Sequence, residues 1–255
     1  VIFNPKARGE KAKRFRRHLD DLGEQCAFKP TLSAGAGRAL AAEAVSEGYE
    51  TIVAAGGDGT VNEVLNGIGD VPGGFARARL AVLPIGTVNV FAREIGVSLH
   101  WLRAWETIRR GRETLIDLPQ MEFASNGQRQ TRYFIQMAGA GWDARAVELV
   151  SWKLKKVIGQ FAYMIAGLKA LLGPPSKLTV LNGSQSIAGE LVVIGNGRYY
   201  GGQISVFQNA DLSDGLLDVC VFPRVTFLAL ARYGWAYVTR GRFKLRQEKY
   251  FQAAS

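Results

Sequence analysis

The chain has 255 residues, of which 47% are hydrophobic and 21% charged, and its net charge is +10. This composition excludes a disordered chain, and the length is enough for one large core or two modest domains. No run of 18 uncharged apolar residues occurs, so we expect no membrane span. The two cysteines and two histidines are far apart in the sequence: Cys26, Cys220, His18 and His100. Their spacing does not match a zinc site or a serine–histidine triad, and it predicts free thiols.

The first 116 residues alternate short apolar segments with amphipathic ones. The apolar segments predict strands and the amphipathic segments predict helices. We expect strands at residues 1–4, 27–31, 51–55 and 80–84, and helices at 10–22, 38–47, 61–66 and 102–110. Such a series predicts a parallel sheet covered on both faces by helices. Because the chain opens within the first expected strand, we also expect the sequence to lack its true amino terminus.

The segment most informative about the chemistry of the protein is Gly56–Thr60, between the third expected strand and the third expected helix. Three glycines in four positions let the backbone approach a ligand closely, and Thr60 can cap a helix beginning at Val61. A strand, a glycine turn and a helix amino terminus together bind phosphate through backbone N–H groups. Asp58 would repel phosphate unless it holds Mg²⁺ or a proton donor. The alternative interpretation is a tight turn with an aspartate cap.

Two further loops are predicted at the same edge of the sheet. Residues 83–93 again show a strand, a Gly-Thr turn and a helix start, and residues 3–9 include Lys6 and Arg8. Either cation could reach a phosphate group. Because the carboxyl ends of parallel strands face one crevice, where such sheets bind nucleotides, three loops there strengthen the prediction of a nucleotide site.

From about Asp117 the pattern changes to short strands separated by turn signals. Asn126-Gly127 and Asn182-Gly183 are dipeptides typical of hairpin turns. We expect strands at 121–125, 132–137, 177–181, 190–194 and 216–222, and helices at 155–172 and 226–240. This half therefore predicts an antiparallel β-sandwich, and we place the two domains at residues 1–116 and 117–255.

Several of these segments together resemble the diacylglycerol kinase catalytic family, which includes bacterial diacylglycerol kinase-like lipid kinases and the sphingosine and ceramide kinases. They are Asn4-Pro5, Gly56–Asn62, Pro84–Asn89, Gly139–Ala144, Asn196–Gly202 and Asp211–Asp218, which span nearly the whole chain in the family's order. The resemblance implies an NAD-kinase-like α/β domain that binds ATP, followed by a β-sandwich that binds the lipid. It also implies transfer of the γ-phosphate of ATP to a lipid hydroxyl, such as that of diacylglycerol.

The resemblance implies roles for individual residues. Asp58 would act near the metal and the transferred phosphate, and Asp117 would belong to the active-site polar network. The residues implied in nucleotide binding are Asn4, Lys6, Thr31, Gly56, Gly57, Asp58, Gly59, Thr60, Glu63, Gly86, Thr87 and Asn89. Mg²⁺ would bind Asp214 and backbone carbonyls near Asp211 and Leu216, since Mg²⁺ prefers oxygen ligands. The alternative interpretation of Asp214-Gly215 is a plain turn.

The chain departs from the family pattern in one way that bears on chemistry. The family's proposed base is an aspartate in an Asp-Gly-Glu triplet, and no such triplet occurs before Ser255. We therefore name no certain base, and expect either a fragment cut before it or a copy that lacks it. Three alternatives remain. An NAD kinase shares the Gly-Gly-Asp-Gly loop but lacks the Pro84–Asn89 element, and a phosphofructokinase shares the loop but has a larger α/β plan and needs sugar-phosphate residues that we cannot place. The third is a nucleotide-binding protein without kinase activity.

The basic charge predicts either a solvated surface or attraction to anionic lipid head groups. Much of it lies on the polar face of the first helix, and Lys153, Lys155 and Lys156 begin an amphiphilic stretch over 152–172. That stretch suits a bilayer interface or, alternatively, a helix packed across the sandwich. No motif indicates nucleic acid. We expect a cytoplasmic protein, peripheral at the inner membrane surface, and leave open a homodimer formed through sandwich edges.

Overall fold

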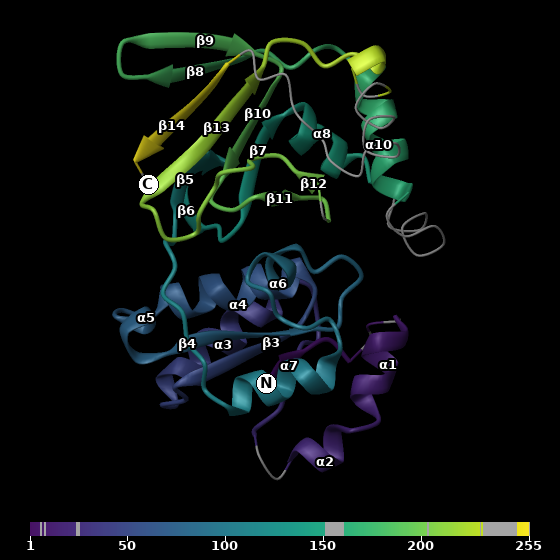
Figure 1. Cartoon of the computed structure of the whole chain (residues 1–255), viewed down its shortest axis with the longest axis vertical. Coiled ribbons are helices and arrows are strands. Elements are labelled where there is room, and N and C mark those ends of the chain that lie inside the picture. Colours follow the sequence, from purple (N-terminus) through teal and green to yellow (C-terminus); the bar gives the residue numbers. More distant parts are fainter. Residues whose placement is uncertain are drawn as a thin grey trace. The chain divides into compact units, whose positions relative to one another are not determined.

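The computed structural model describes residues 1–5, 7, 9–23, 26–150, 161–202, 204–229, 231 and 249–254. The chain divides into two compact units, Val1–Ile135 with Gly201–Gln203, and Gln136–Tyr200 with Ile204–Ser255. Figure 1 shows a mixed α/β amino-terminal unit and a carboxyl-terminal unit rich in antiparallel strands. None of the helices in the described ranges has the length and hydropathy that a bilayer crossing requires.

The amino-terminal unit contains a four-stranded parallel sheet in the order β2-β1-β3-β4. The strands are β1 (Ile2–Phe3), β2 (Lys29–Pro30), β3 (Thr51–Gly56) and β4 (Arg79–Pro84). The helices are α1 (Glu10–Arg16), α2 (Leu19–Gly23), α3 (Ala36–Ser46), α4 (Asp58–Asp70), α5 (Gly74–Arg77), α6 (Val90–Glu94) and α7 (Trp101–Arg109). The predicted parallel α/β domain is confirmed.

Aromatic and aliphatic side chains join this sheet to its helices. The ring of Phe15 on α1 meets Phe3 of β1 and Trp101 of α7 edge-on, each at 5.9 Å between centroids. On α4, the side chains at positions 61, 64, 65 and 68 are all buried. That spacing puts them on one face of the helix, which explains why this segment forms a helix packed on the sheet.

Three predictions for this unit need correction. The segment 10–22 forms two helices, because the chain turns at Arg17 and His18, where the imidazole lies 5.1 Å from the ring of Trp101. The second strand is only two residues long. Helix α4 begins at Asp58 with Gly57 as its N-cap, so Thr60 is not a cap. Its side chain instead covers Gly56, where an added Cβ would lie 2.2 Å from Oγ1 of Thr60.

The Asn126-Gly127 hairpin is confirmed as β5 (Gln120–Ser125) and β6 (Gln128–Tyr133), with both turn residues at positive φ. The hairpin belongs to the amino-terminal unit, so the compact units divide after Ile135, later than the boundary placed between 116 and 117. The cause is packing, because Tyr133 lies against Gly69 of α4, where an added Cβ would meet the ring at 2.4 Å.

The carboxyl-terminal unit contains an antiparallel sheet in the order β14-β13-β10-β7 and two short hairpins. Its strands are β7 (Met137–Gly141), β8 (Leu178–Asn182), β9 (Gln185–Gly189), β10 (Leu191–Gly195), β11 (Tyr199–Tyr200), β12 (Ile204–Ser205), β13 (Leu216–Phe222) and β14 (Tyr250–Ala254). Its helices are α8 (Trp142–Glu148) and α10 (Phe161–Leu171). Apolar clusters pack on both faces of this sheet, around Phe207 and around Val192, as expected of a sandwich.

Two strand assignments in this unit need correction. The Asn182-Gly183 turn joins β8 to β9, a strand that the sequence did not predict, with Gly183 at φ 56°, and β10 pairs with β7 and β13. The strand expected at 132–137 is split between the end of β6 and the first residue of β7. Of the two predicted helices, residues 155–160 of the first and most of 226–240 lie outside the described residues.

Candidate active site

The glycine loops after β3 and β4 are joined by backbone hydrogen bonds. The carbonyl oxygen of Gly56, the last residue of β3, accepts the N–H groups of Ile85 and Gly86 at 3.2 and 3.1 Å. Because β3 and β4 are adjacent and parallel, both loops leave the sheet at the same edge. The prediction that the two loops meet is confirmed.

Close backbone contact makes glycine necessary where the loops touch. An added Cβ on Gly86 would lie 2.4 Å from Cα of Gly57 and 2.8 Å from its nitrogen. Side-chain-bearing residues do not tolerate such distances, so a larger residue at 86 would separate the loops. By contrast, an added Cβ on Gly59 would meet nothing within 4 Å, so space remains beside the first turn of α4.

Asp58 links the same two loops through its side chain. Its Oδ1 accepts the backbone N–H of Phe91 in the first turn of α6 at 3.2 Å. A carboxylate at a helix amino terminus is electrostatically favourable, because that end carries partial positive charge. One oxygen of Asp58 thus has a structural role. No hydrogen bond to its other oxygen occurs among the described residues.

Asn89 has the side chain most directly suggestive of a ligand. It is the N-cap of α6 in the left-handed conformation, at φ 56°, and is 2% exposed. Its Nδ2 donates to the carbonyl of Gly86 at 2.8 Å, while its buried Oδ1 has no hydrogen-bond partner among the described residues. A buried amide oxygen without a partner costs free energy. A donor or a cation at this position would remove that cost.

Glu63 occupies the amino terminus of α3. Its two carboxylate oxygens accept the N–H groups of Gly35 and Gly37, each at 3.0 Å. Gly35 is the N-cap of α3, so the carboxylate sits where a bound anion would otherwise sit. The resemblance placed Glu63 among the nucleotide-binding residues; in the structure its carboxylate supports the turn before α3.

The amino terminus of α4 has no comparable occupant. No side chain caps it in the described part of the chain, and Val61 N–H bonds to the carbonyl of Gly57 at 3.1 Å. The first N–H groups of a helix lack intrahelical partners and point outward. These groups, the space at Gly59 and the Oδ1 of Asn89 together suit a nucleotide's phosphates with their counter-cation.

The other residues that the resemblance implies in nucleotide binding follow strands of this sheet or are not among the described residues. Thr31 follows β2, is 8% exposed, and donates its N–H to Phe3 at 2.8 Å. Asn4 follows β1 and accepts the N–H of Ala7 at 3.2 Å, whereas Thr87 is exposed in the loop after β4. Lys6 lies outside the described residues. Asp117 lies on the irregular segment between α7 and β5, so its place in an active-site polar network stays a prediction.

The implied Mg²⁺ residues form turns in the carboxyl-terminal unit. Asp211 accepts the N–H and the hydroxyl of Ser213 at 2.9 and 2.7 Å, and Oδ1 of Asp214 accepts the N–H of Leu216 at 2.9 Å. Among the described residues, no group of three or more His, Cys, Asp or Glu side chains is placed to hold a metal. The implied set has two carboxylates and backbone oxygens, so the Mg²⁺ site stays a prediction.

Sequence reasoning missed two carboxylates in that unit. Asp143 on α8 accepts a hydrogen bond from the hydroxyl of Tyr200, and Asp218 on β13 accepts one from the hydroxyl of Tyr250. Burial raises the pKa of Asp143, and the hydrogen bond from Tyr200 lowers it in part. Burial likewise raises the pKa of the Cys220 thiol to about 11. The tyrosines lie 57 and 32 positions away in sequence, so no local pattern could have revealed these pairs.

A parallel sheet ending in joined glycine loops, followed by an antiparallel sandwich, defines a two-domain protein that combines an α/β unit with a β-sandwich. Comparison with protein families makes this specific. The diacylglycerol kinase catalytic domain matches residues 1–121, and the YegS C-terminal NAD kinase beta sandwich-like domain matches residues 136–251. The chain belongs to the diacylglycerol kinase family, so the resemblance stated from its motifs is confirmed.

Individual relatives agree. The chain is 31% identical over 245 residues to the "Diacylglycerol kinase" of Bacillus subtilis, covering 91% of this chain and 76% of that protein. It is 33% identical over 230 residues to a "Probable lipid kinase YegS-like" of Pseudomonas aeruginosa, covering 88% and 71%. The crystal structure of a diacylglycerol kinase from Bacillus anthracis shares the fold, with a TM-score of 0.70 at 24% identity over 99% of this chain and 82% of that one.

Proposed function

We propose that the protein is an ATP-dependent lipid kinase, which transfers the γ-phosphate of ATP to the hydroxyl of a lipid such as diacylglycerol. The observation that carries the proposal is the pair of joined loops, in which Gly57 and Gly86 touch and Asn89 presents a buried, unpartnered oxygen. The family of the chain supports the same reaction class.

In this proposal the phosphates of ATP bind the free amino terminus of α4. The N–H groups of its first turn and its partial positive charge favour an anion there. The carboxylate of Glu63 already meets the N–H groups at the amino terminus of α3. The nucleotide is therefore directed to the loop after β3, where Gly59 leaves room.

The oxygens of Asp58 and Asn89 would meet a hard cation beside the phosphates. Mg²⁺ prefers oxygen ligands and, when bound, would neutralise charge on the transferring phosphoryl group. Asp58 is suited to this position because Phe91 N–H holds one of its oxygens and fixes the carboxylate. The Asn89 amide is fixed in the same way by the carbonyl of Gly86.

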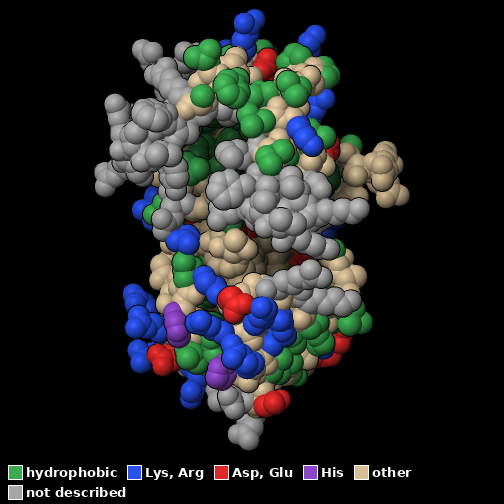
Figure 2. Space-filling view, turned by 90° about the vertical axis from the view of Figure 1, so that its right-hand side faces the viewer, with side chains coloured by type: hydrophobic (Ala, Val, Ile, Leu, Met, Phe, Trp, Pro, Cys, Tyr) green, Lys and Arg blue, Asp and Glu red, His purple; other side chains and the backbone are tan. Residues whose placement is uncertain are grey.

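Access to a lipid hydroxyl requires contact with a membrane surface, and the basic face of the amino-terminal unit supports this. Figure 2 shows Lys and Arg side chains gathered around the two histidines on one face of that unit. Exposed cations include Lys13 and Arg14 on α1, Arg17 directly after it and Arg103 on α7. Such a face would attract anionic head groups. The lysines at 153, 155 and 156 lie outside the described residues.

The proposal is tested by measuring Mg²⁺-dependent transfer of labelled γ-phosphate to a panel of lipid alcohols in mixed micelles. Asp58→Asn is the matched variant, since it keeps an acceptor for Phe91 N–H but removes the charge. We expect transfer to at least one lipid and a loss of about 10²-fold or more in Asp58→Asn. Transfer to NAD alone would identify an NAD kinase, and ATP binding without transfer would identify a nucleotide-binding protein.

A further inference from the structure

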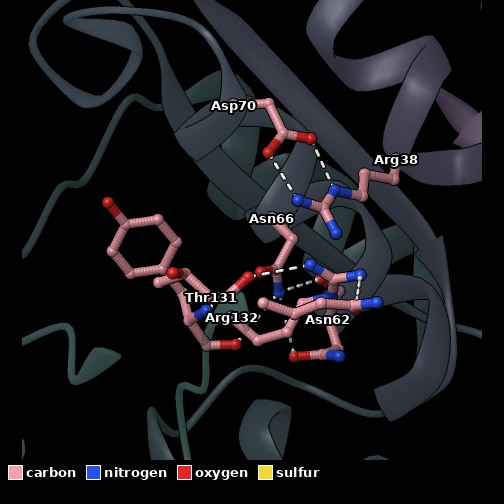
Figure 3. A network of polar contacts seen from close by, with 8 residues as sticks. Arg38, Asn62, Asn66, Asp70, Thr131 and Arg132 are labelled. Carbon is pink, nitrogen blue, oxygen red and sulfur yellow. Dashed lines mark hydrogen bonds and ion pairs between the residues drawn. The ribbon is translucent and has the colours of Figure 1, made fainter. Parts of the chain in front are cut away.

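A polar groove of about 620 Å³ lies on the amino-terminal unit, between hairpin β5–β6 and the carboxyl-terminal half of α4. Figure 3 shows the labelled side chains of its wall, with the Arg38–Asp70 pair, Asn66 and Arg132 close together. Most of the side chains that line it carry hydrogen-bond donors. Among them are Arg38, Gln128, Arg129, Gln130 and Arg132, while Asp70 contributes a carboxylate that only accepts.

One end of the groove is rigid because the hairpin is fixed on α4. Nδ2 of Asn66 donates to the carbonyl of Tyr133 at 3.0 Å, and its Oδ1 accepts the N–H of Tyr133 at 2.9 Å. The ring of Tyr133 also meets Phe75 edge-on, at 5.3 Å between centroids. Asn66 is 3% exposed, so these bonds are protected from solvent. A ligand in the groove would meet a preformed wall.

The groove has surplus positive charge. Asp70 ends α4, where the helix carbonyls already carry partial negative charge, and Arg38 neutralises it through two 2.5 Å bonds. Arg132 has no ion-pair partner among the described residues. Two of its five N–H groups donate to the carbonyl of Thr131 and to Oε1 of Gln130. The other three have no acceptor among the described residues. Arg129 has only a 3.4 Å contact with the exposed Glu122.

The groove is distinct from the glycine loops. Helix α4 has 13 residues, with Asp58 at its first position and Asp70 at its last. At 1.5 Å per residue its ends are about 18 Å apart. The Arg38–Asp70 pair marks the end of the helix opposite the loops, so a ligand bound there would not occupy the nucleotide's phosphate position.

Beside the groove, two apolar side chains share a face of the hairpin with two of its lining residues, Arg132 and Gln130. In the hairpin register Met121 pairs with Arg132 and Phe123 pairs with Gln130, so all four lie on one face. Met121 and Phe123 are 38% and 37% exposed. A face that combines a guanidinium with open donors, a carboxamide and two exposed apolar side chains fits an anionic group attached to an apolar or neutral remainder.

We propose that this groove binds a phosphate ester. Its oxygens would accept the open N–H donors of Arg132 and the amide of Gln130, and its carbon-bearing remainder would lie on Met121 and Phe123. A phosphate ester reaches a protein either as a soluble molecule or as a lipid head group in a bilayer. The chemistry of recognition is the same for both, and the experiment below separates them.

The soluble form is tested by titrating glycerol 3-phosphate into the protein by calorimetry, with saturating ATP present to fill the glycine loops. We expect Arg132→Gln to weaken binding about tenfold, as loss of a charge-assisted bond does. Arg112→Gln, which removes an exposed cation outside the groove, is the matched control and should leave binding unchanged. Thermal unfolding of each variant verifies that the fold is intact.

The lipid form is tested by sedimentation with phosphatidylcholine vesicles that do or do not contain phosphatidic acid. A drop in binding for Arg132→Gln, deepened by Met121→Ser with Phe123→Ser, assigns the groove to a lipid phosphate. A drop in the calorimetric assay alone assigns it to a soluble ester. If Arg132→Gln changes neither assay, or if Arg112→Gln lowers binding equally, the groove is not a phosphate-ester site.

Discussion

Two carboxylates of the amino-terminal unit and two of the carboxyl-terminal unit have different kinds of partner. In the amino-terminal unit, Glu63 and Asp58 accept backbone N–H groups at the starts of α3 and α6. In the carboxyl-terminal unit, Asp143 and Asp218 accept tyrosine hydroxyls. Backbone N–H groups hold a carboxylate in one place on the main chain. Asp58 and Glu63 thus organise loops of the main chain, whereas Asp143 and Asp218 join strands and helices through side chains. Backbone contacts also occur in the second unit, where Asp211 and Asp214 accept N–H groups within turns.

A narrower comparison lies within the first unit. Helices α3 and α4 both begin at the carboxyl edge of the parallel sheet, but the start of α3 holds Glu63 and the start of α4 holds no side chain in the described ranges. Of these two helix amino termini, only that of α4 is left open to an anion. The account of phosphate binding depends on this asymmetry.

The largest expected effect comes from separating the two glycine loops. In Gly86→Ala the added Cβ would meet Gly57, so the loops must move apart. A displacement of this size at a phosphate site should lower kcat/KM for ATP about 10²-fold. The melting temperature of Gly86→Ala is measured beside its activity, so that a local displacement of the loops is distinguished from a loss of the fold. Equal activity in wild type and Gly86→Ala would show that the loop contact is not needed.

Asn89→Gly tests the unpartnered oxygen without straining the backbone, since glycine adopts a positive φ freely. We expect nucleotide affinity in the presence of Mg²⁺ to fall about tenfold, as for loss of one hydrogen bond to a charged group. Without Mg²⁺ the two proteins should differ less. Calorimetric titration with ATP measures the affinity under each condition. An equal loss of affinity with and without Mg²⁺ would show that Oδ1 of Asn89 does not act through the cation.

Glu63→Ala should destabilise the fold by about 1–2 kcal/mol, because it removes the acceptor of two N–H groups at the start of α3. Denaturant unfolding measures this free energy. Glu47→Ala, which loses an exposed contact with Lys29, is the control and should cost about 0–1 kcal/mol. A second binding step for ATP in Glu63→Ala would show that the amino terminus of α3 can bind phosphate once Glu63 is removed. That result would explain directly why only α4 is open in the wild-type protein.

The smallest effect is a pH dependence in the other unit. Because burial raises the folded-state pKa of Asp143 above 3.8, the folded protein holds this proton more tightly than the unfolded chain. That stabilisation is present at low pH and is lost as pH rises through the folded pKa. Asp143→Asn should therefore gain melting temperature relative to wild type from pH 4 to pH 7. A constant difference across that range would contradict the assignment.

The sequence was most informative where a local rule decides structure. The buried β-branched run at 51–55 and the strand at 216–222 follow from their apolar residues, and the Asn126-Gly127 turn follows from its need for positive φ. The start of α4 was misplaced, because Gly57 takes the cap position while Thr60 packs on Gly56. The packing of Thr60 on Gly56, and not the preference of threonine for the N-cap position, determined where the helix begins.

Long-range contacts account for what local rules missed in the site. The glycine loops were predicted to meet because parallel strands share an edge. The partners of Glu63 lie 26 and 28 positions away, and those of Asn66 on the hairpin lie 67 positions away. No periodicity links such residues. The hairpin was therefore assigned to the second domain, although Tyr133 fixes it to the first.

The most direct test of the central claim is a titration with Mg²⁺–ATP followed by backbone amide NMR shifts on the 27.8 kDa chain. The account predicts large changes at Asp58, Gly59 and Thr60, at the free start of α4. It predicts small changes at Gly35 and Gly37, whose N–H groups already bond to Glu63. Large shifts at the start of α3 and none at the start of α4 would contradict it.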